Sequence, residues 1–127
     1  MIYGVGTDVV EIERIRSALE RFGERFARRI LCEPELKRFR GHRLPANYLA
    51  KRFAAKEAFT KALGTGIHAP ANWHGVWVEN LRSGKPELHF TPALKDLLEQ
   101  RGIRRAHLSL TDERALAAAT VILECDA

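Results

Sequence analysis

The chain has 127 residues, 46% of them hydrophobic and 29% charged, which predicts one folded domain over residues 1–127 and excludes a disordered chain. Its 21 lysines and arginines against 16 aspartates and glutamates give a formal charge of +5, which favours an anionic partner. Two cysteines form no disulfide framework or zinc motif, and there is no apolar run long enough to cross a bilayer and no signal peptide. We therefore expect a cytoplasmic protein with no membrane association.

The N-terminal third predicts a strand followed by helices. The opening stretch MIYGVGTDVV is rich in strand-forming residues and short. Apolar residues then recur every three or four positions over residues 12–30, which predicts an amphipathic helix, bent at Gly23. Pro34 and the polar run RGHRLPAN predict a short helix and then a loop.

The middle of the chain predicts a second long helix, a hairpin and a third helix. Helical patterning resumes over residues 48–63, and Gly64 lies where a C-terminal cap is expected. The segments GVWVENL and PELHF alternate around RSGK, as in a β-hairpin. Thr91 is a typical N-cap, with Pro92 at the first helical position and an end near Gly102.

Two further strands close the chain. The segments AHLSL and ALAAATVIL flank the turn TDER. Strands and helices do not alternate regularly, so the order predicts an α+β fold, with an antiparallel sheet packed against helices, and no internal repeat.

Asp8 is the first candidate functional residue. It is expected where the first strand leads into the helix, shortly after Gly4 and Gly6, which allow a ligand or another backbone to approach closely. A carboxylate there could bind a cation, but aspartate is also a favoured helix cap. Asp8 alone therefore leaves both interpretations open.

The stretch FAAKEAFTKALGTG is the second candidate site. Glu57 and Lys61 are four residues apart, a spacing that is typical of an ordinary surface ion pair. Arg52 and Lys56 add two cations, and the turn GTG that follows leaves its backbone accessible. Together these groups suit Mg²⁺ bridging a pyrophosphate, because Mg²⁺ takes one or two carboxylates and fills its remaining positions with water and phosphate oxygens.

Several other chemistries lack their motifs. The sequence has neither a Walker loop nor a dinucleotide fingerprint, its five histidines show no metal-ligand spacing, and no nucleophile motif is present. The arginines of the first helix form either a solvated face or a docking surface for an acidic helix. Charge alone does not decide between these two interpretations.

Four motifs together resemble the 4'-phosphopantetheinyl transferase family, and most closely its short bacterial members, the holo-acyl-carrier-protein synthases. They are GVGTDVVEIERI, RFAAKEAFTKALGTGI, GKPELHF and HLSLTDERALAAATVILE, and they span nearly the whole chain in order. The resemblance implies a single-lobed phosphopantetheinyl transferase fold. It also implies a Mg²⁺-dependent transfer of the 4'-phosphopantetheine group from coenzyme A to a serine of apo acyl carrier protein, with release of adenosine 3',5'-bisphosphate.

The resemblance assigns Asp8 and Glu57 to Mg²⁺ and Lys61 to the pyrophosphate, and these three are the expected catalytic residues. The metal and the cations would offset charge on the phosphate oxygens during in-line attack by the serine. A general base is needed for the serine, and it is either Glu57 or a water held by the carboxylates. The sequence leaves this choice open, as it leaves open which carrier is preferred, whether acylated coenzyme A is accepted and whether Mn²⁺ substitutes.

The resemblance also assigns the coenzyme A contacts. Arg52 and Lys61 are expected at the phosphates, Gly64 and Gly66 in a turn that lines the site, and residues 85–86 (Lys85 and Pro86) at the adenine end. Arg43 is a further candidate phosphate contact.

One pair of residues departs from the family pattern. Thr111 and Asp112 stand where many members have Ser or Thr followed by His, so that no role of the imidazole can be transferred to this chain. Thr111 is still expected to bond a phosphate. Both residues are also common at the start of a hairpin turn, which is the interpretation we favour for Asp112.

Partners follow from the same reasoning. Arg14 and Arg21, seven residues apart on one side of the first helix, are expected to dock an acidic helix of the carrier. A single-lobed chain is expected to complete its sites between the subunits of a homotrimer, for which the alanine-rich last strand could supply a flat surface. The rival functions are a basic nucleic-acid-binding domain, although no RNA- or DNA-binding motif is present, and a non-catalytic adaptor for an acidic protein.

Overall fold

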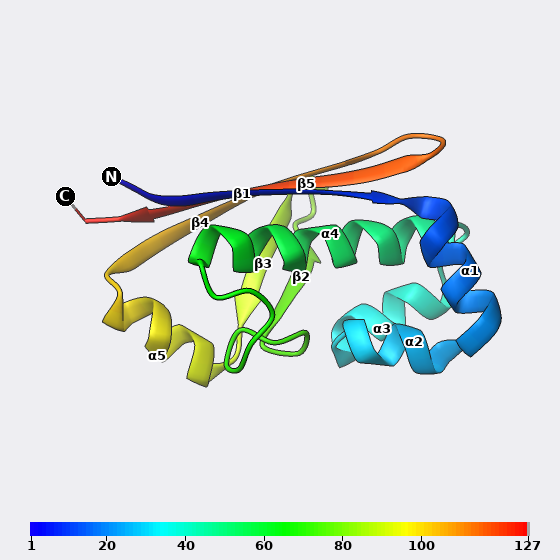
Figure 1. Cartoon of the computed structure of the whole chain (residues 1–127), viewed down its shortest axis with the longest axis horizontal. Helices are drawn as coiled ribbons and strands as arrows, with labels where there is room; N and C mark the ends of the chain where they lie inside the picture. Colours follow the sequence, from blue (N-terminus) through cyan, green and yellow to red (C-terminus); the bar gives the residue numbers. More distant parts are fainter. Residues whose placement is uncertain (127) are drawn as a thin grey trace.

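The computed structural model describes residues 1–126, which form five strands and five helices (Figure 1). In chain order the elements are β1 (Ile2–Glu11), α1 (Ile12–Phe22), α2 (Glu24–Ile30), α3 (Glu33–Arg40), α4 (Pro45–Leu63), β2 (Val76–Asn80), β3 (Pro86–Phe90), α5 (Pro92–Gln100), β4 (Ile103–Asp112) and β5 (Leu116–Cys125).

The main sheet brings the two ends of the chain together. Its three antiparallel strands have the order β1–β5–β4, so the last strand lies between the first strand and β4. In this register Asp8 is paired with Ala119. Figure 1 shows α4 running along one face of this sheet, with α5 at one end of the helix and α1–α3 at the other.

Glycines in β1 allow the strand to lie directly on α4. A Cβ atom at Gly4 would overlap the carbonyl oxygen of Ala62, and one at Gly6 would overlap that of Ala58. The residues of α4 that face these glycines are Ala58 and Ala62, whose small side chains allow the strand to approach the helix closely. Because the side chains of a strand alternate between its faces, Asp8, two residues after Gly6, is directed to the same side as Gly6.

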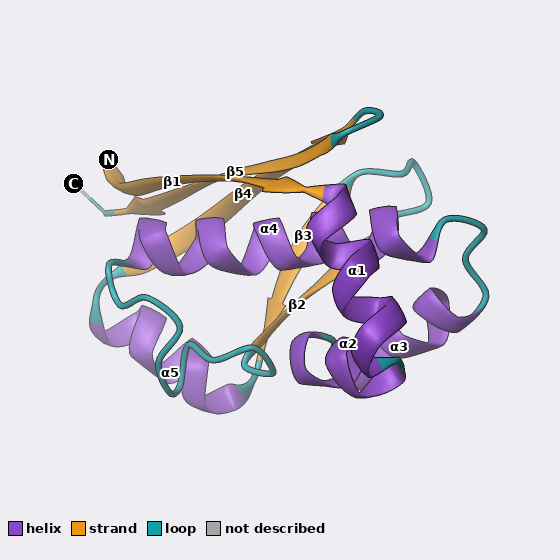
Figure 2. Cartoon of the chain, turned by 45° about the vertical axis from the view of Figure 1, so that its right-hand side comes forward, coloured by secondary structure: helices purple, strands orange, loops and turns teal. Residues whose placement is uncertain are grey.

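The helical end of the molecule packs as a second core. Gly23 has a φ of 65°, which a residue with a side chain rarely adopts, and it separates α1 from α2. Buried residues from α1, α2, α3 and the start of α4, with Ala117 of β5, form one hydrophobic cluster, while most of the sheet, the rest of α4, the β2–β3 hairpin and α5 form another. Figure 2 shows α1, α2 and α3 gathered at one end of α4, away from α5. The chain thus has two cores along one long helix, α4.

The expected α+β fold is confirmed, and so are the hairpin, the bend at Gly23, the left-handed cap at Gly64 and the cap at Thr91, whose hydroxyl accepts from Leu94 N. Some expected boundaries are wrong. The first strand ends at Glu11, one residue later than expected. Helix α4 begins at Pro45, three residues before the expected start at residue 48. Among residues 1–126, no helix combines the length and apolar character that a membrane span requires.

Candidate active site

Asp8 and Glu57 lie on the wall of one cavity, of about 550 Å³. Asp8 comes from β1 and Glu57 from the middle of α4, so the contact between this strand and this helix brings the two carboxylates together. Arg14, on the first turn of α1, lines the same cavity. Residues that are distant in the sequence therefore lie on one cavity. The family resemblance implied that Asp8 and Glu57 would lie close together.

Lys61 is paired with Asp8 beside this cavity. Its ammonium donates hydrogen bonds to Oδ1 of Asp8 at 3.0 Å and to the carbonyl oxygen of Thr7 at 3.1 Å. The lysine side chain is 52% exposed and that of Asp8 only 15%, so the lysine can leave the pair more easily than the carboxylate can move. Lys61 is thus a solvent-exposed cation paired with a mostly buried carboxylate.

The electrostatics of Glu57 suit a cation. Burial raises the pKa of its carboxyl above the ordinary value, the carboxylate of Asp8 raises the pKa further, and Lys61 acts in the opposite direction. Two carboxylates that repel each other in a partly buried cavity are stabilised when a divalent cation binds between them. Among residues 1–126 no group of three or more His, Cys, Asp or Glu side chains is arranged to hold a metal, so this pair fits an ion that keeps water and phosphate oxygens as its other ligands.

Two of the ordinary interpretations of these residues are wrong. Asp8 does not cap α1, because it lies within β1, three residues before the strand ends, and the N-cap position belongs to Glu11. Lys61 has its ion pair with Asp8 instead of with Glu57 four residues before it. The spacing in the sequence did not show that a strand would supply a closer partner.

The side chains of Lys56 and Arg52, which were expected around Glu57, have other partners. Lys56 is completely buried and pairs with Glu35 at 2.8 Å. Arg52 is also buried, and its guanidinium donates to Asn80 Oδ1 at 2.6 Å and stacks over the ring of Tyr48. The Nε of Arg52 is buried with no hydrogen-bond partner within residues 1–126, so this donor is left unsatisfied.

The other expected coenzyme A contacts are spread over the molecule. Gly64 and Gly66 have φ values of 88° and 66° in the turn after α4, with open space beside both Cα atoms. Lys85 and Pro86 line a separate cavity, of about 370 Å³, between β3 and β4. Thr111 is exposed near the end of β4. Within one chain these residues do not line the cavity that holds Asp8 and Glu57.

The departure at Asp112 has a structural explanation. The turn of the last hairpin is formed by residues 113–115 and so begins two positions later than expected, and Asp112 is the last residue of β4. Its carboxylate accepts from Asn47 Nδ2 at 3.1 Å and lies 3.4 Å from Lys51 Nζ. Asp112 therefore ties β4 to α4 from the end of the strand, and the expectation that it begins the turn is wrong.

The arginines of the first helix occupy different surroundings. Arg14 lines the cavity of Asp8 and Glu57, whereas Arg21 is exposed at the end of α1, with its guanidinium over the ring of Phe22. Arg43 lines a smaller cavity with Arg16, at the N-terminal end of α4. The structure thus joins Arg14 to the carboxylates and leaves Arg21 on the outer surface.

The sequence reasoning missed the aromatic wall of the cavity. Phe26 of α2 and Phe53 of α4 line it together with Asp8 and Glu57, and so does the third acidic residue, Glu11. Phe53 could have been found, because it precedes Glu57 by four residues and so lies on the same helical face. No sequence signal indicated that Phe26 of α2 would lie beside it.

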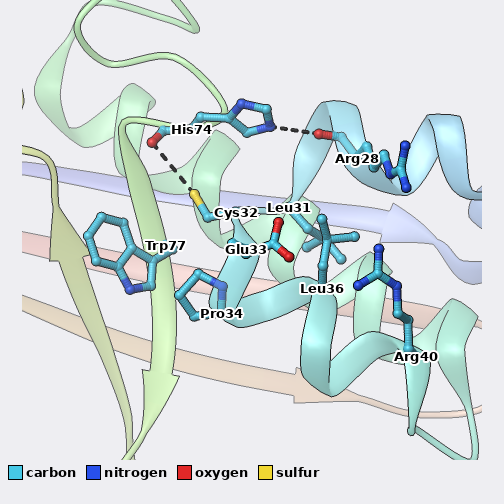
Figure 3. A pocket seen from close by; sticks show the side chains of 9 residues that line it. All are labelled: Arg28, Leu31, Cys32, Glu33, Pro34, Leu36, Arg40, His74 and Trp77. Atoms are coloured by element: carbon cyan, nitrogen blue, oxygen red, sulfur yellow. Dashed lines mark hydrogen bonds between the residues drawn. The ribbon is translucent and has the colours of Figure 1, made fainter.

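A larger cavity, of about 660 Å³, lies between α2, α3 and β2 (Figure 3). His74 Nε2 donates to the carbonyl oxygen of Arg28 at 2.6 Å, and Cys32 Sγ lies 3.5 Å from the carbonyl oxygen of His74. None of the site residues expected from the sequence lines this cavity. Size alone therefore does not identify the active site.

Comparisons with known proteins agree with the motifs. Residues 4–120 match the family model described as "4'-phosphopantetheinyl transferase superfamily". The chain is 51% identical over 124 residues to the holo-[acyl-carrier-protein] synthase of Nitrosomonas europaea, covering 98% of this chain and 99% of that one. It is also similar to the crystal structure of the holo-[acyl-carrier-protein] synthase of Neisseria meningitidis, with a TM-score of 0.94, 48% identity, and coverage of 98% and 99%. The Bacillus anthracis synthase in complex with CoA (3',5'-ADP) gives a TM-score of 0.84 at 34% identity, with 99% of each chain covered.

Proposed function

Because the chain belongs to the 4'-phosphopantetheinyl transferase superfamily, we propose that it transfers the 4'-phosphopantetheine group of coenzyme A to a serine hydroxyl of an apo acyl carrier protein. The bond between the β-phosphorus and the bridging oxygen breaks, and adenosine 3',5'-bisphosphate leaves. The expected enzyme class, a transferase of the holo-acyl-carrier-protein synthase type, is confirmed by the relatives, and the nucleic-acid-binding rival has no support. The observation that carries the proposed reaction is the cavity that Asp8 and Glu57 share.

We propose Mg²⁺ as the cofactor, held by Asp8 and Glu57. The support is that the two carboxylates lie on one cavity, where burial and then repulsion from Asp8 raise the pKa of Glu57. When bound, the ion supplies positive charge to the phosphate oxygens of coenzyme A. Neutral residues at either position would leave the other carboxylate without this partner.

Two side chains then act on the substrates. Lys61, which is exposed and bonded to Asp8, would place its ammonium at the pyrophosphate of coenzyme A and offset its negative charge. The proton of the carrier serine goes to Glu57 or to a water that the carboxylates hold. Arg52, Gly64, Gly66, Lys85, Pro86 and Thr111 remain proposed contacts of coenzyme A.

We propose that the carrier docks on α1. Arg14 lines the cavity, and Arg21 follows two turns later, so an acidic helix held by both would place its serine near Glu57. Phe26 and Phe53 offer it an apolar contact.

We further propose a cytoplasmic homotrimer of single-domain subunits, with the active sites between subunits. Two observations support this proposal. The face of the sheet away from α4 exposes Val5 and Val9, each 56% accessible, beside Ala118, Thr120 and Ile122 of β5. The proposed coenzyme A contacts also lie apart within one chain, so a neighbouring subunit could supply some of them. Sedimentation of an active monomer at assay concentrations would be incompatible with this assembly.

The reaction is tested by incubating the protein with coenzyme A, Mg²⁺ and an apo carrier, and measuring the intact mass of the carrier. We expect one phosphopantetheine per carrier, and none on a carrier whose acceptor serine is replaced by alanine. An unmodified carrier, together with tight and salt-sensitive DNA binding, would instead favour the nucleic-acid-binding function.

A further inference from the structure

Lys56 and Glu35 form an ion pair that is sealed from water. Nζ of Lys56 lies 2.8 Å from Oε1 of Glu35, and both side chains are 0% exposed. The same ammonium donates to the carbonyl oxygens of Ile30 at 2.6 Å and Trp73 at 2.8 Å. A lysine ammonium has three N–H donors, and these three acceptors use all of them.

Glu35 extends the network to two more elements. Its Oε1 also accepts from the backbone N–H of Cys32 at 2.9 Å, and Oε2 accepts from that of Val78 at 2.9 Å. The pair thus connects α4 to the last residue of α2, the start of α3, the loop before β2, and β2 itself. Figure 3 shows the surroundings, with Leu31 and Cys32 between α2 and α3. A buried ion pair is often no more stabilising than apolar residues of the same volume, so stability alone does not account for it.

Two of these bonds hold residues that lie next to the wall of the active-site cavity. Ile30 is the last residue of α2, and Phe26, one turn earlier on that helix, lines the cavity. The ring of Trp73 lies 5.1 Å, centroid to centroid, from that of Phe53, which lines the cavity next to Glu57. Lys56 itself does not line the cavity.

We infer that Lys56 is a positioning residue for the carrier side of the site: by holding Ile30 and Trp73 against α4, it sets the places of Phe26 and Phe53 on the wall of the cavity that Asp8 and Glu57 also line. This inference rests on the proposed function for its kinetic part. Lys56 touches neither carboxylate through its side chain, so the groups proposed to hold Mg²⁺ keep their positions without it. Loss of Lys56 should therefore affect the carrier far more than the metal.

The first test uses the variant Lys56→Met/Glu35→Gln, which removes both charges and leaves no unpaired ion in the interior. We expect the KM for the carrier to rise on the order of 10- to 100-fold, as when reacting groups are displaced by about 1 Å. Mg²⁺ affinity without substrates, measured by calorimetry, should stay within about twofold of the wild type. A carrier KM equal to that of the wild type would overturn the inference.

A matched control separates positioning from loss of stability. Leu98, on α5, is buried in the other hydrophobic cluster, and Leu98→Ala destabilises the chain without touching the aromatic wall. At a temperature where both variants are folded, Leu98→Ala should keep the wild-type carrier KM. If the two variants raise this KM equally, Lys56 contributes only to stability.

The second test does not depend on activity. The chain has two tryptophans, Trp73 and Trp77, so in a Trp77→Phe background fluorescence reports Trp73 alone. We expect acrylamide to quench Trp73 more strongly after Lys56→Met/Glu35→Gln, and no such change after Leu98→Ala. Unchanged quenching would contradict the inference even if the wild type modifies carriers. A wild type that modifies no carrier would instead contradict the proposed function and leave the quenching result to decide on Lys56.

Discussion

The ammonium of Lys61 lies 3.0 Å from Oδ1 of Asp8, and this bond joins α4 to β1 across 53 residues of sequence. The lysine is therefore hydrogen-bonded to the carboxylate that we propose as a Mg²⁺ ligand. A cation bound to Asp8 and the ammonium of Lys61 would compete for the same oxygen, since each is stabilised by the same negative charge. Removal of the ammonium should therefore increase the affinity of Asp8 for Mg²⁺.

Replacing Lys61 by methionine should have opposite effects on metal binding and on turnover. Without its competitor, Asp8 should bind Mg²⁺ several-fold more tightly in the absence of substrates, as calorimetry can measure. Transfer should nevertheless fall on the order of 100-fold, because a cation at the pyrophosphate is lost. Lys51→Met is the control, because Lys51 lies on the same helix but pairs with Asp112. Weaker Mg²⁺ binding after Lys61→Met would show that Lys61 supports the metal site instead of competing for it.

The two proposed ligands should act as one unit. Asp8→Asn and Glu57→Gln should each lower turnover by at least about 100-fold with the fold intact, because an amide is a poorer ligand for a hard cation. Groups that act together have strongly non-additive effects, so the double variant should be little worse than either single one. Near-wild-type turnover of either single variant at ordinary Mg²⁺ concentrations would remove that residue from the site.

Glu57 should destabilise the metal-free fold at neutral pH. Its pKa is raised in the folded chain, mainly by burial and also by Asp8, so the folded state holds this proton more readily than the unfolded state. The loss of folding stability caused by ionised Glu57 is complete above the pKa of Glu57 in the folded state. It disappears as the pH falls through the ordinary glutamate pKa of about 4.3. Glu57→Gln should therefore raise the Tm in EDTA at pH 8 and leave it unchanged at about pH 4.

A calorimetric series over pH checks this sign. Glu99→Gln serves as the control, because Glu99 is exposed on α5. A Tm of Glu57→Gln below that of the wild type at pH 8 would contradict the raised pKa.

Charge reversal on α1 should weaken binding of the carrier only. Arg14→Glu/Arg21→Glu should raise the carrier KM by about tenfold or more and leave coenzyme A affinity unaltered, because like charges repel an acidic helix. Rising salt should weaken the wild-type interaction, since the Debye length is about 8 Å at physiological ionic strength. Arg82→Glu, in the exposed turn between β2 and β3, should not change the carrier KM. An unaltered KM in the double variant means that the carrier docks elsewhere.

Gly6 should tolerate no side chain. Gly6→Ala places a Cβ against the carbonyl oxygen of Ala58 and should cost about 1–3 kcal/mol in the free energy of unfolding, as overpacking does. Gly41→Ala meets no atom within 4 Å and should be nearly neutral. Denaturant unfolding measures both, and equal stability of the two variants would contradict the close packing of β1 on α4.

Local patterns in the sequence predicted most of the elements. Turn and cap residues such as Gly23, Gly64 and Thr91 act within a few positions, so their effects can be read without the fold. The order β1–β5–β4 could not be predicted, because it depends on pairing between the two ends of the chain.

The site was only partly predictable for a related reason. Helix α4 is buried on nearly all sides, so its sequence does not show which residues face the cavity. Lys56 and Glu57 are neighbours, yet Lys56 points to Glu35 in the interior and Glu57 to the cavity near Asp8. The link between Asp8 and Glu57 came from the family resemblance, since no spacing in the sequence could place a strand against this helix.

The central claim is that Asp8 and Glu57 together support transfer of phosphopantetheine to a carrier serine. The most direct measurement follows adenosine 3',5'-bisphosphate by chromatography and carrier mass by mass spectrometry in the same reaction, for the wild type and Asp8→Asn. We predict equal amounts of released nucleotide and modified carrier for the wild type, a requirement for Mg²⁺, and a loss of both products in the variant. Release of the nucleotide without carrier modification, or full activity of Asp8→Asn, would contradict the account.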